Sequence, residues 1–257
     1  STLSSSSAAS DVYKRQIKWD TGEIEHVATR KRILEEIDDS LRRLDVDIID
    51  LYQIHWPDEN TPLEESICTM IELQKQGKIR SIGVSNFSVE QMQEVMRHGR
   101  LDSLQPRYNM FQREIEEDIL PFCRNNAIGV VSYGPMYQGF LTGKFHLTER
   151  MPADPLRSQH QELQGERYEI DKDTLLKLKK IADAREKTLA QLAINWVVGR
   201  RGITVAICGA RNPKQVKQNV GAADWSLSDQ ERSRIDDILG ERKRRIAAQE
   251  EKEAAQT

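Results

Sequence analysis

The sequence has few cysteines, and they lie far apart. Cys68, Cys123 and Cys208 are odd in number, and their spacing matches no familiar set of metal ligands. Widely separated thiols do not suggest a disulfide framework, so we expect them to be small core residues in a reducing compartment. The sequence therefore predicts no metal site and a cytoplasmic protein.

The sequence also lacks a basic excess and a long apolar run. Its net charge is −3, which disfavours nucleic acid as a partner. No apolar run is long enough to cross a bilayer, and the first residues lack the basic-then-apolar pattern of a secretory signal. With 38% apolar and 31% charged residues, the composition is that of a globular protein with well-solvated helices.

The two ends of the chain differ in composition from its middle. Residues 1–16 are Ser-rich and aperiodic, so we expect a disordered leader that is not native to the gene. Residues 17–240 form the expected domain, and 241–257 a charged tail that is a frayed helix or disordered. The chain length of 257 residues is close to the roughly 250 of one α/β barrel.

Apolar, β-branched runs alternate with amphipathic segments along the domain. The runs predict strands over 48–54, 79–84, 103–105, 128–133 and 203–208. Helical spacing predicts helices over 29–44, 62–76, 89–97, 115–126, 171–184 and 188–199, and two more from 213 and from 228. Capping boxes are expected at Thr61/Glu64, Ser88/Gln91, Thr188/Gln191 and Ser228/Glu231. Residues 134–170 are expected to form a long connection.

This alternation predicts a parallel sheet covered by helices. A closed barrel and an open doubly wound sheet both fit the pattern. No Gly-x-Gly-x-x-Gly follows any strand, which disfavours a Rossmann fold.

Polar residues stand where several of the predicted strands end. They are His55, Ser85, Asn86, Gln105, Tyr133 and the turn 209–212. Each alone also fits a structural role, such as a buried histidine with one hydrogen bond. Together, amide and hydroxyl groups beside an aromatic ring suit a flat, amide-bearing ligand, and Arg211 before a helix suits a phosphate. The residues themselves indicate a nucleotide-cofactor or phosphate-ligand enzyme.

Five ordered segments resemble the aldo-keto reductases, and most resemble the bacterial-type branch related to potassium-channel β subunits. The resemblance covers about Ile17 to Leu239. Its blocks are 48–57 (IIDLYQIHWP), 77–87 (GKIRSIGVSNF), 105–109 (QPRYN), 133–144 (YGPMYQGFLTGK) and 209–213 (GARNP) with Gln218-Asn219.

The resemblance implies a (β/α)8 TIM barrel that binds NADP(H) and transfers hydride between the nicotinamide and a small carbonyl or alcohol substrate. His55 falls on the catalytic histidine, and Ser85, Asn86 and Gln105 on residues that hold the carboxamide. Tyr133 falls on the ring that stacks on the nicotinamide. The pyrophosphate loop matches Gly134, Pro135, Met136, Gln138, Gly139, Leu141 and Lys144. The adenosine and 2′-phosphate segment matches Gly209, Arg211, Gln215, Gln218 and Asn219, although many members have Glu at the position of Gln218.

One part of the family pattern has no match. The family's catalytic Tyr, Asp and Lys precede its His, and no block here corresponds to them. Tyr13 and Lys14 lie in the unmatched leader, and Tyr52 has the wrong strand parity to face the same way as His55. We therefore expect an incomplete barrel with strands four to eight of eight, without strands one to three, that does not itself reduce carbonyls.

Two alternatives to an incomplete reductase remain. One is a non-catalytic NADP(H)-binding regulatory subunit of the channel β-subunit type, and the other an unrelated phosphate-binding barrel. The segment 145–170 either borders the ligand or is a surface loop. Neither the substrate nor the oligomeric state follows from the sequence.

Overall fold

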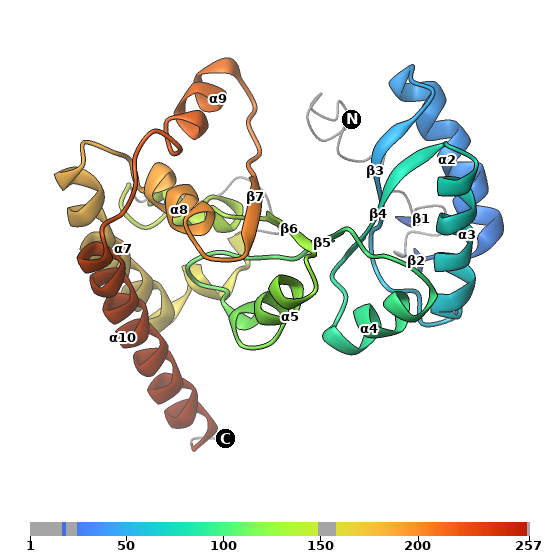
Figure 1. The fold of residues 1–257 in the computed structure, drawn as a ribbon. Coiled ribbons are helices and arrows are strands. Elements are labelled where there is room, and N and C mark those ends of the chain that lie inside the picture. Colours follow the sequence, from blue (N-terminus) through green and yellow to red (C-terminus); the bar gives the residue numbers. More distant parts are fainter. Residues whose placement is uncertain (1–16, 19–24, 149–157, 256–257) are drawn as a thin grey trace. The chain divides into compact units, whose positions relative to one another are not determined.

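The computed structural model describes residues 17–18, 25–148 and 158–255, so the expected leader 1–16 lies outside it. The chain divides into two compact units, each described here by itself. The first unit comprises residues 1–107, 114–133 and 202–211, and the second comprises 108–113, 134–201 and 212–257 (Figure 1).

The first unit contains a five-stranded parallel sheet with the strand order β3-β4-β5-β6-β7. Its strands are β3 (Ile49–Ile54), β4 (Ile79–Ser85), β5 (Ser103–Gln105), β6 (Gly129–Tyr133) and β7 (Ile203–Ile207). All five lie where the apolar runs predicted them. A separate antiparallel pair joins β1 (Ile17–Lys18) and β2 (Glu25–His26).

Helices connect β3 to β4, β4 to β5 and β5 to β6, as parallel pairing requires. They are α3 (Leu63–Lys75), α4 (Val89–His98), and the 3-10 turn η1 (Glu114–Glu116) with α5 (Ile119–Asn125), whereas α2 (Arg30–Leu44) precedes β3. Figure 1 shows α2 and α3 together on one side of β3 and β4. The fully buried core there includes Ile37, Met70, Leu73 and Val84.

The second unit is helical. Its elements are η2 (Tyr137–Thr142), η3 (Gln161–Leu163), α7 (Gly165–Ala184), α8 (Leu189–Val198), α9 (Pro213–Val220) and α10 (Asp229–Ala254). The segment 134–170, expected to be a long connection, thus contains two short 3-10 turns, and α7 begins earlier than residue 171. Residues 149–157 of this segment lie outside the described residues.

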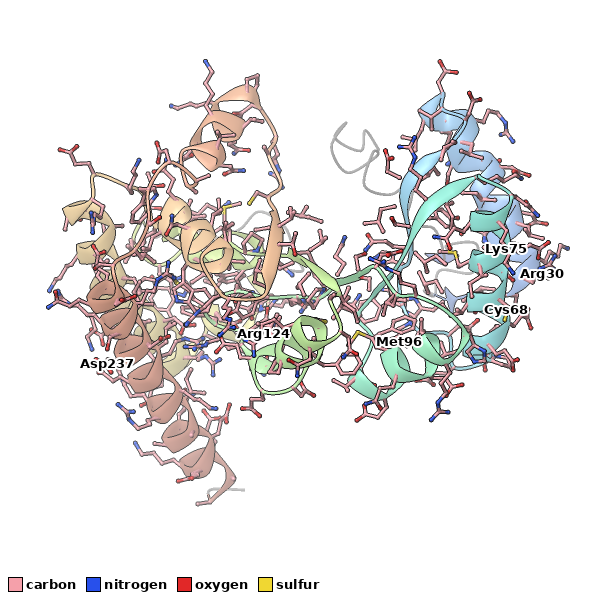
Figure 2. The ribbon with its side chains drawn as sticks, in the orientation of Figure 1. Arg30, Cys68, Lys75, Met96, Arg124 and Asp237 are labelled. Carbon is pink, nitrogen blue, oxygen red and sulfur yellow. The ribbon has the colours of Figure 1, made fainter. Side chains whose placement is uncertain are left out.

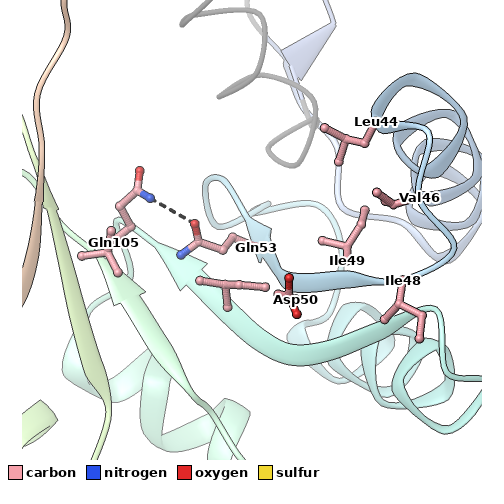
Figure 3. Close-up of a pocket in the computed structure, with 9 residues that line it drawn as sticks. Leu44, Val46, Ile48, Ile49, Asp50, Gln53 and Gln105 are labelled. Atoms are coloured by element: carbon pink, nitrogen blue, oxygen red, sulfur yellow. Dashed lines mark hydrogen bonds between the residues drawn. The ribbon is translucent and has the colours of Figure 1, made fainter. Parts of the chain in front are cut away.

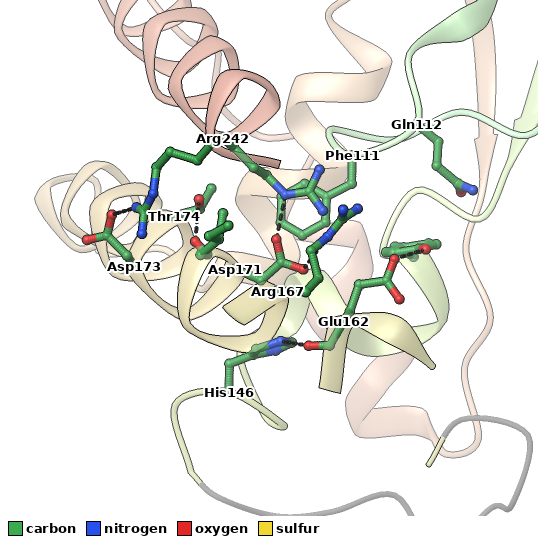
Figure 4. A network of polar contacts seen from close by, with 12 residues as sticks. Phe111, Gln112, His146, Glu162, Arg167, Asp171, Asp173, Thr174 and Arg242 are labelled. Atoms are coloured by element: carbon green, nitrogen blue, oxygen red, sulfur yellow. Dashed lines mark hydrogen bonds and ion pairs between the residues drawn. The ribbon is translucent and has the colours of Figure 1, made fainter. Parts of the chain in front are cut away.

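The charged segment from residue 241 is not frayed over its described part, because α10 runs through it to Ala254. Arg242 and Ile246 are buried in this stretch. The Arg242 Nε donates to Asp171 Oδ1 of α7 at 2.6 Å, and its guanidinium lies 3.6 Å from the Phe111 ring centroid (Figure 4). Burial raises the pKa of Asp171, although the cations of Arg242 and Arg167 oppose that shift. This ion pair and the packing around it order the helix far beyond what its composition suggests.

Three of the four expected capping boxes are present, at Ser88, Thr188 and Ser228. The box at Thr61 is wrong: α3 has Pro62 as its N-cap without a side-chain hydrogen bond. The Thr61 hydroxyl instead donates to Asp58 Oδ2 at 2.6 Å. The hydroxyl expected to accept from the helix therefore donates to a carboxylate three residues earlier in the chain.

One cysteine expectation is also wrong. Cys123 is buried and Cys208 half-buried, but Cys68 is exposed on α3. Its helix position places it outside the apolar stripe that Ile67, Met70 and Leu73 form against the sheet.

A bidentate ion pair fixes the start of α10. The Nε and Nη2 of Arg185 donate to the two carboxylate oxygens of Glu231 at 2.6 and 2.7 Å. Glu231 also accepts from the Ser228 backbone amide at 2.8 Å. The hydrogen bond from Arg185, opposed by burial, together with the contacts to Ser228, lowers the pKa of Glu231 to about 2.

We expect Glu231→Gln to lower the free energy of unfolding by about 1 kcal/mol at neutral pH, because it removes a partly exposed ion pair. Because the pKa of Glu231 is depressed, its ionised form stabilises the fold at pH values above the ordinary carboxyl pKa of about 4.5. This stabilisation is lost as the pH falls towards about 2. The difference between variant and wild type in urea unfolding should therefore shrink below about pH 4.5. Asp229→Asn, in the same first turn, keeps this ion pair and should show no such convergence.

Candidate functional site

The carboxyl ends of four neighbouring strands bring the predicted polar residues together. β3 pairs with β4 through Ile54 opposite Val84, and β4 pairs with β5 through Ser85 opposite Gln105. Because parallel strands end at one edge of a sheet, the residues that follow them become neighbours.

Asn86 is the centre of this group. Its Nδ2 donates to the His55 carbonyl at 3.2 Å and lies 3.1 Å from Ser85 Oγ. Its Oδ1 accepts from the Tyr133 hydroxyl at 2.9 Å. The Ser85 hydroxyl in turn donates to the Gln105 carbonyl at 2.8 Å. Five predicted site residues, from four strands, thus form one connected cluster.

The backbone of Asn86 explains why an asparagine can hold this position. Its φ of 63° lies in the left-handed region, which Asn tolerates better than most residues. That conformation turns the chain away from β4 and directs the amide towards β3 and β6. Asn86 is half-buried, as are His55 and Tyr133, so the cluster retains a solvent-facing side.

A row of amide and hydroxyl groups continues from the cluster along the sheet. Gln105 Nε2 donates to Gln53 Oε1 at 3.0 Å, and Gln53 Nε2 donates to Ser103 Oγ at 3.2 Å. Gly83 makes room for this row, since a Cβ there would lie 2.3 Å from Ser103 Oγ. Gln105 is 1% exposed, and its Oε1 has no hydrogen-bond partner among the described residues.

Our sequence interpretation missed Gln53. It lies two residues before His55, so strand parity places both on the same face of β3. That parity was the signal that could have found it.

A cavity of about 370 Å³ borders the same row (Figure 3). Its lining is mostly apolar and comes mainly from β3 and the residues before it: Leu44, Val46, Ile48, Ile49, Asp50, Leu51 and Gln53, with Gln105 and Val131. Of the predicted site residues, only Gln105 borders it. The cavity therefore extends along the sheet towards the start of β3, away from His55.

A buried carboxylate holds the segment that follows His55. Asp58 accepts from the Ala28 amide at 2.8 Å and from the Asn60 amide at 2.9 Å, besides the Thr61 hydroxyl. Burial opposes ionisation of Asp58, but these donors outweigh it and lower its pKa. Trp56 packs between two imidazoles, with ring centroids 6.3 Å from His55 and 5.4 Å from His26.

The predicted pyrophosphate loop belongs to the second unit. Tyr137, Gln138 and Gly139 have φ values of 45°, 53° and 98°, a run of left-handed residues that turns the backbone sharply. The Tyr137 hydroxyl donates to Glu162 at 2.5 Å, and His160 Nδ1 lies 2.6 Å from the same carboxylate. Burial and the contact with Glu162 raise the pKa of Tyr137 far above its usual range, so this hydroxyl stays protonated.

Other loop residues differ in exposure. Pro135 and Leu141 are buried, Gly134, Met136 and Gly139 are half-buried, and Gln138 and Lys144 are exposed. The Lys144 ammonium lies 4.5 Å from the Phe145 ring centroid.

The predicted adenosine segment is exposed. Gly209 and Arg211 belong to the first unit and follow β7, whereas Gln215, Gln218 and Asn219 lie on α9 of the second. Asn212 caps α9 by accepting from the Gln215 amide at 3.0 Å. Gln218 Nε2 donates to Thr188 Oγ1 at 3.3 Å. The structure therefore joins Asn86 to four other predicted residues, whereas the residues of the predicted pyrophosphate loop and of α9 belong to the second unit.

Comparison with known proteins identifies the family. The model of the aldo/keto reductase family matches residues 7–240. The chain belongs to this family. The match begins within the segment 1–16, which the sequence interpretation placed outside the domain.

The chain is similar to several named relatives. It is 39% identical over 227 residues to aldo-keto reductase YhdN of Bacillus subtilis, covering 88% of this chain and 69% of the relative. It is 34% identical to the NADH-specific methylglyoxal reductase of Escherichia coli, with coverages of 77% and 61%. It is 36% identical to a probable voltage-gated potassium channel subunit beta of Arabidopsis thaliana, with coverages of 76% and 62%. The resemblance to the branch that includes channel β subunits is thus confirmed.

A solved structure supports the fold. The glycerol dehydrogenase AKR11B4 of Gluconobacter oxydans aligns with a TM-score of 0.84 at 38% identity, covering 89% of this chain and 71% of that one. The fold is therefore that of the aldo-keto reductase barrel, of which five parallel strands are described here. No helix among the described residues is long and apolar enough to cross a membrane.

We expect Asn86→Ala to destabilise the fold by about 2–4 kcal/mol, because it removes two inter-strand hydrogen bonds and leaves a β-carbon in the left-handed region. Asn86→Gly removes the same hydrogen bonds, but glycine adopts a positive φ without strain. Its loss of stability should therefore be roughly 1 kcal/mol smaller. Urea unfolding of both variants measures the difference. Equal losses would show that the backbone conformation is not a constraint here.

Proposed function

We propose that this chain is the NADP(H)-binding part of an oxidoreductase that interconverts small carbonyl compounds and alcohols. The observation that carries the proposal is the cluster around Asn86, beside which Gln105 Oε1 is buried with no hydrogen-bond partner in the described part of the chain. A carboxamide offers both N–H donors and a carbonyl acceptor, so its amino group would satisfy that oxygen. The residues present therefore fit a nicotinamide.

Each residue of the cluster has a distinct part in this proposal. Ser85, Asn86 and Gln105 hold the carboxamide, and the Tyr133 ring, fixed through its hydroxyl, provides the flat face for stacking. His55, at the end of β3, orients the substrate carbonyl oxygen through its imidazole. When bound, the nicotinamide supplies or accepts the hydride.

Cationic and backbone groups would hold the phosphates. The turn Gly134–Leu141 with Lys144 suits the pyrophosphate, because its tightly curved backbone allows close approach. Arg211 and the start of α9 suit the 2′-phosphate, since free amides and the helix dipole favour an anion. Gly209 admits the adenosine, which Gln215, Gln218 and Asn219 would contact. On this basis we propose a preference for NADP(H), although one relative is named as NADH-specific.

A second candidate is a regulatory subunit that binds the cofactor without catalysis. The sequence matches none of the family's Tyr, Asp and Lys, of which the Tyr gives the proton that a reduced carbonyl needs. A relative is named as a channel β subunit. In this alternative the same cluster holds the cofactor.

We expect NADPH to quench the tryptophan fluorescence of the full chain, with NADH binding more weakly. Arg211→Ala should reduce the preference for NADPH over NADH by about tenfold or more, because a charge-assisted hydrogen bond to phosphate contributes about 1.5–3 kcal/mol. Arg201→Ala removes another exposed arginine, which precedes β7 rather than following it, and should leave the preference unchanged. Equal effects of both variants would show only a general loss of positive charge.

We also expect the 257-residue chain to bind NADPH without consuming it in the presence of small aldehydes. The physical reason is the unmatched proton donor: His55 can orient a carbonyl, but hydride transfer must be accompanied by protonation. The absorbance of NADPH, followed over time at a concentration that saturates binding, measures whether the cofactor is consumed. Sustained turnover that His55→Ala abolishes would contradict the regulatory alternative and place a proton donor within this chain.

A further inference from the structure

Helices α3 and α4 bring three metal-binding side chain types together. Glu64 and Cys68 of α3 and His98 of α4 each offer a ligand atom, and these atoms lie within 4.8 Å of one another. Glu64 and Cys68 are exposed, and His98 is half-buried. This group lies on the helices and shares no residue with the proposed cofactor site (Figure 2 labels Cys68).

The packing of the two helices fixes the arrangement. Glu64 and Cys68 are four residues apart, so they lie one above the other on one face of α3, which Ile71 extends. The C-cap of α4, Gly99, touches this face: a Cβ there would lie only 2.7 Å from Ile71 Cδ1. Because a larger residue would separate the helices, Gly99 places the preceding His98 beside α3.

A second carboxylate orients the imidazole. His98 Nε2 lies 3.2 Å from Glu94 Oε1, one helical turn earlier on α4. Histidines that bind metals commonly donate their other N–H to a carboxylate, which fixes the tautomer and the ring orientation. The contact with Glu94 is of that kind and leaves Nδ1 for a ligand bond.

The chemistry of the set selects the cation. Thiolate, imidazole and carboxylate are the ligands of Zn²⁺, at about 2.0–2.3 Å from the metal. Three protein ligands leave a fourth tetrahedral position for water. Ligand atoms less than 4.8 Å apart need only small side-chain rotations to contract around such an ion.

We propose that Glu64, Cys68 and His98 form a binding site for Zn²⁺ or a similar transition-metal ion, with Glu94 positioning the imidazole. Binding converts the Cys68 thiol to a thiolate and releases its proton to solvent, so affinity falls as the pH decreases. This proposal is independent of the proposed function. The other two cysteines are poor competitors, because burial raises the pKa of Cys123 to about 12 and that of Cys208 to about 11.

Titration of the full chain with Co²⁺ tests the site. We expect one equivalent to produce a thiolate-to-cobalt charge-transfer band and intense tetrahedral d–d bands, both displaced by Zn²⁺. Cys68→Ser should remove the charge-transfer band, and His98→Gln should weaken binding and change the d–d spectrum. Glu94→Gln should weaken Zn²⁺ binding by about 10- to 100-fold without removing the band. Cys208→Ser is the matched control and should retain all signals.

A second readout does not depend on the absorption bands of bound Co²⁺. Zn²⁺ should protect Cys68 of the wild type from alkylation, and His98→Gln should remove that protection while circular dichroism shows an unchanged fold. The proposal is overturned if the wild type binds no stoichiometric metal. It is equally overturned if Cys68→Ser retains the charge-transfer band, or if His98→Gln changes neither affinity nor protection, which would indicate an isolated surface thiol.

Discussion

The parallel register of β3, β4, β5 and β6 is the constraint on which the candidate site depends. Each strand ends at the same edge, so a polar residue placed after each strand must meet its neighbours. A shift of one residue would turn Gln53 and His55 to the opposite face of the sheet. Asn86 fixes this register at its open end, because its single amide contacts both β3 and β6. The geometry of the site and the alignment of the sheet are therefore one property.

Local patterns predicted most of the fold and failed where a distant partner decides the outcome. The five strands and three capping boxes follow from short-range spacing. Thr61 fails as a cap because its hydroxyl donates to nearby Asp58, and the distant partner is Ala28, whose amide, 30 positions away, holds that carboxylate in place. The tail after residue 241 is highly charged, yet it is helical because Asp171 of α7 pairs with Arg242 of α10. Contacts between residues so distant in sequence leave no periodic trace.

The candidate site, like the fold, was predictable where local sequence position decides and not where distant contacts decide. Residues at strand ends could be named because their role depends on position along one strand. Gly83 could not, since its function is to leave space for side chains of β3 and β5. The spacing of Cys68 and His98 could not have indicated their proximity either: thirty positions separate them, and the packing of α3 against α4, with Gly99 close to Ile71, brings them together. Absence of a spacing motif is thus weak evidence against a metal site.

Holding a nicotinamide and protonating a carbonyl make different physical demands. The groups around Asn86 are neutral donors and acceptors that also bond to each other, so they stabilise the sheet whether or not a ligand is present. A proton donor must instead have a pKa displaced by a nearby charge. The pKa of Tyr137 is instead raised, because burial and then Glu162 favour the neutral form, so this hydroxyl holds a loop and gives up no proton. The proposed cofactor cluster is therefore compatible with a reductase and with a regulatory subunit, and an ionisable pair beside His55 is what would separate the two.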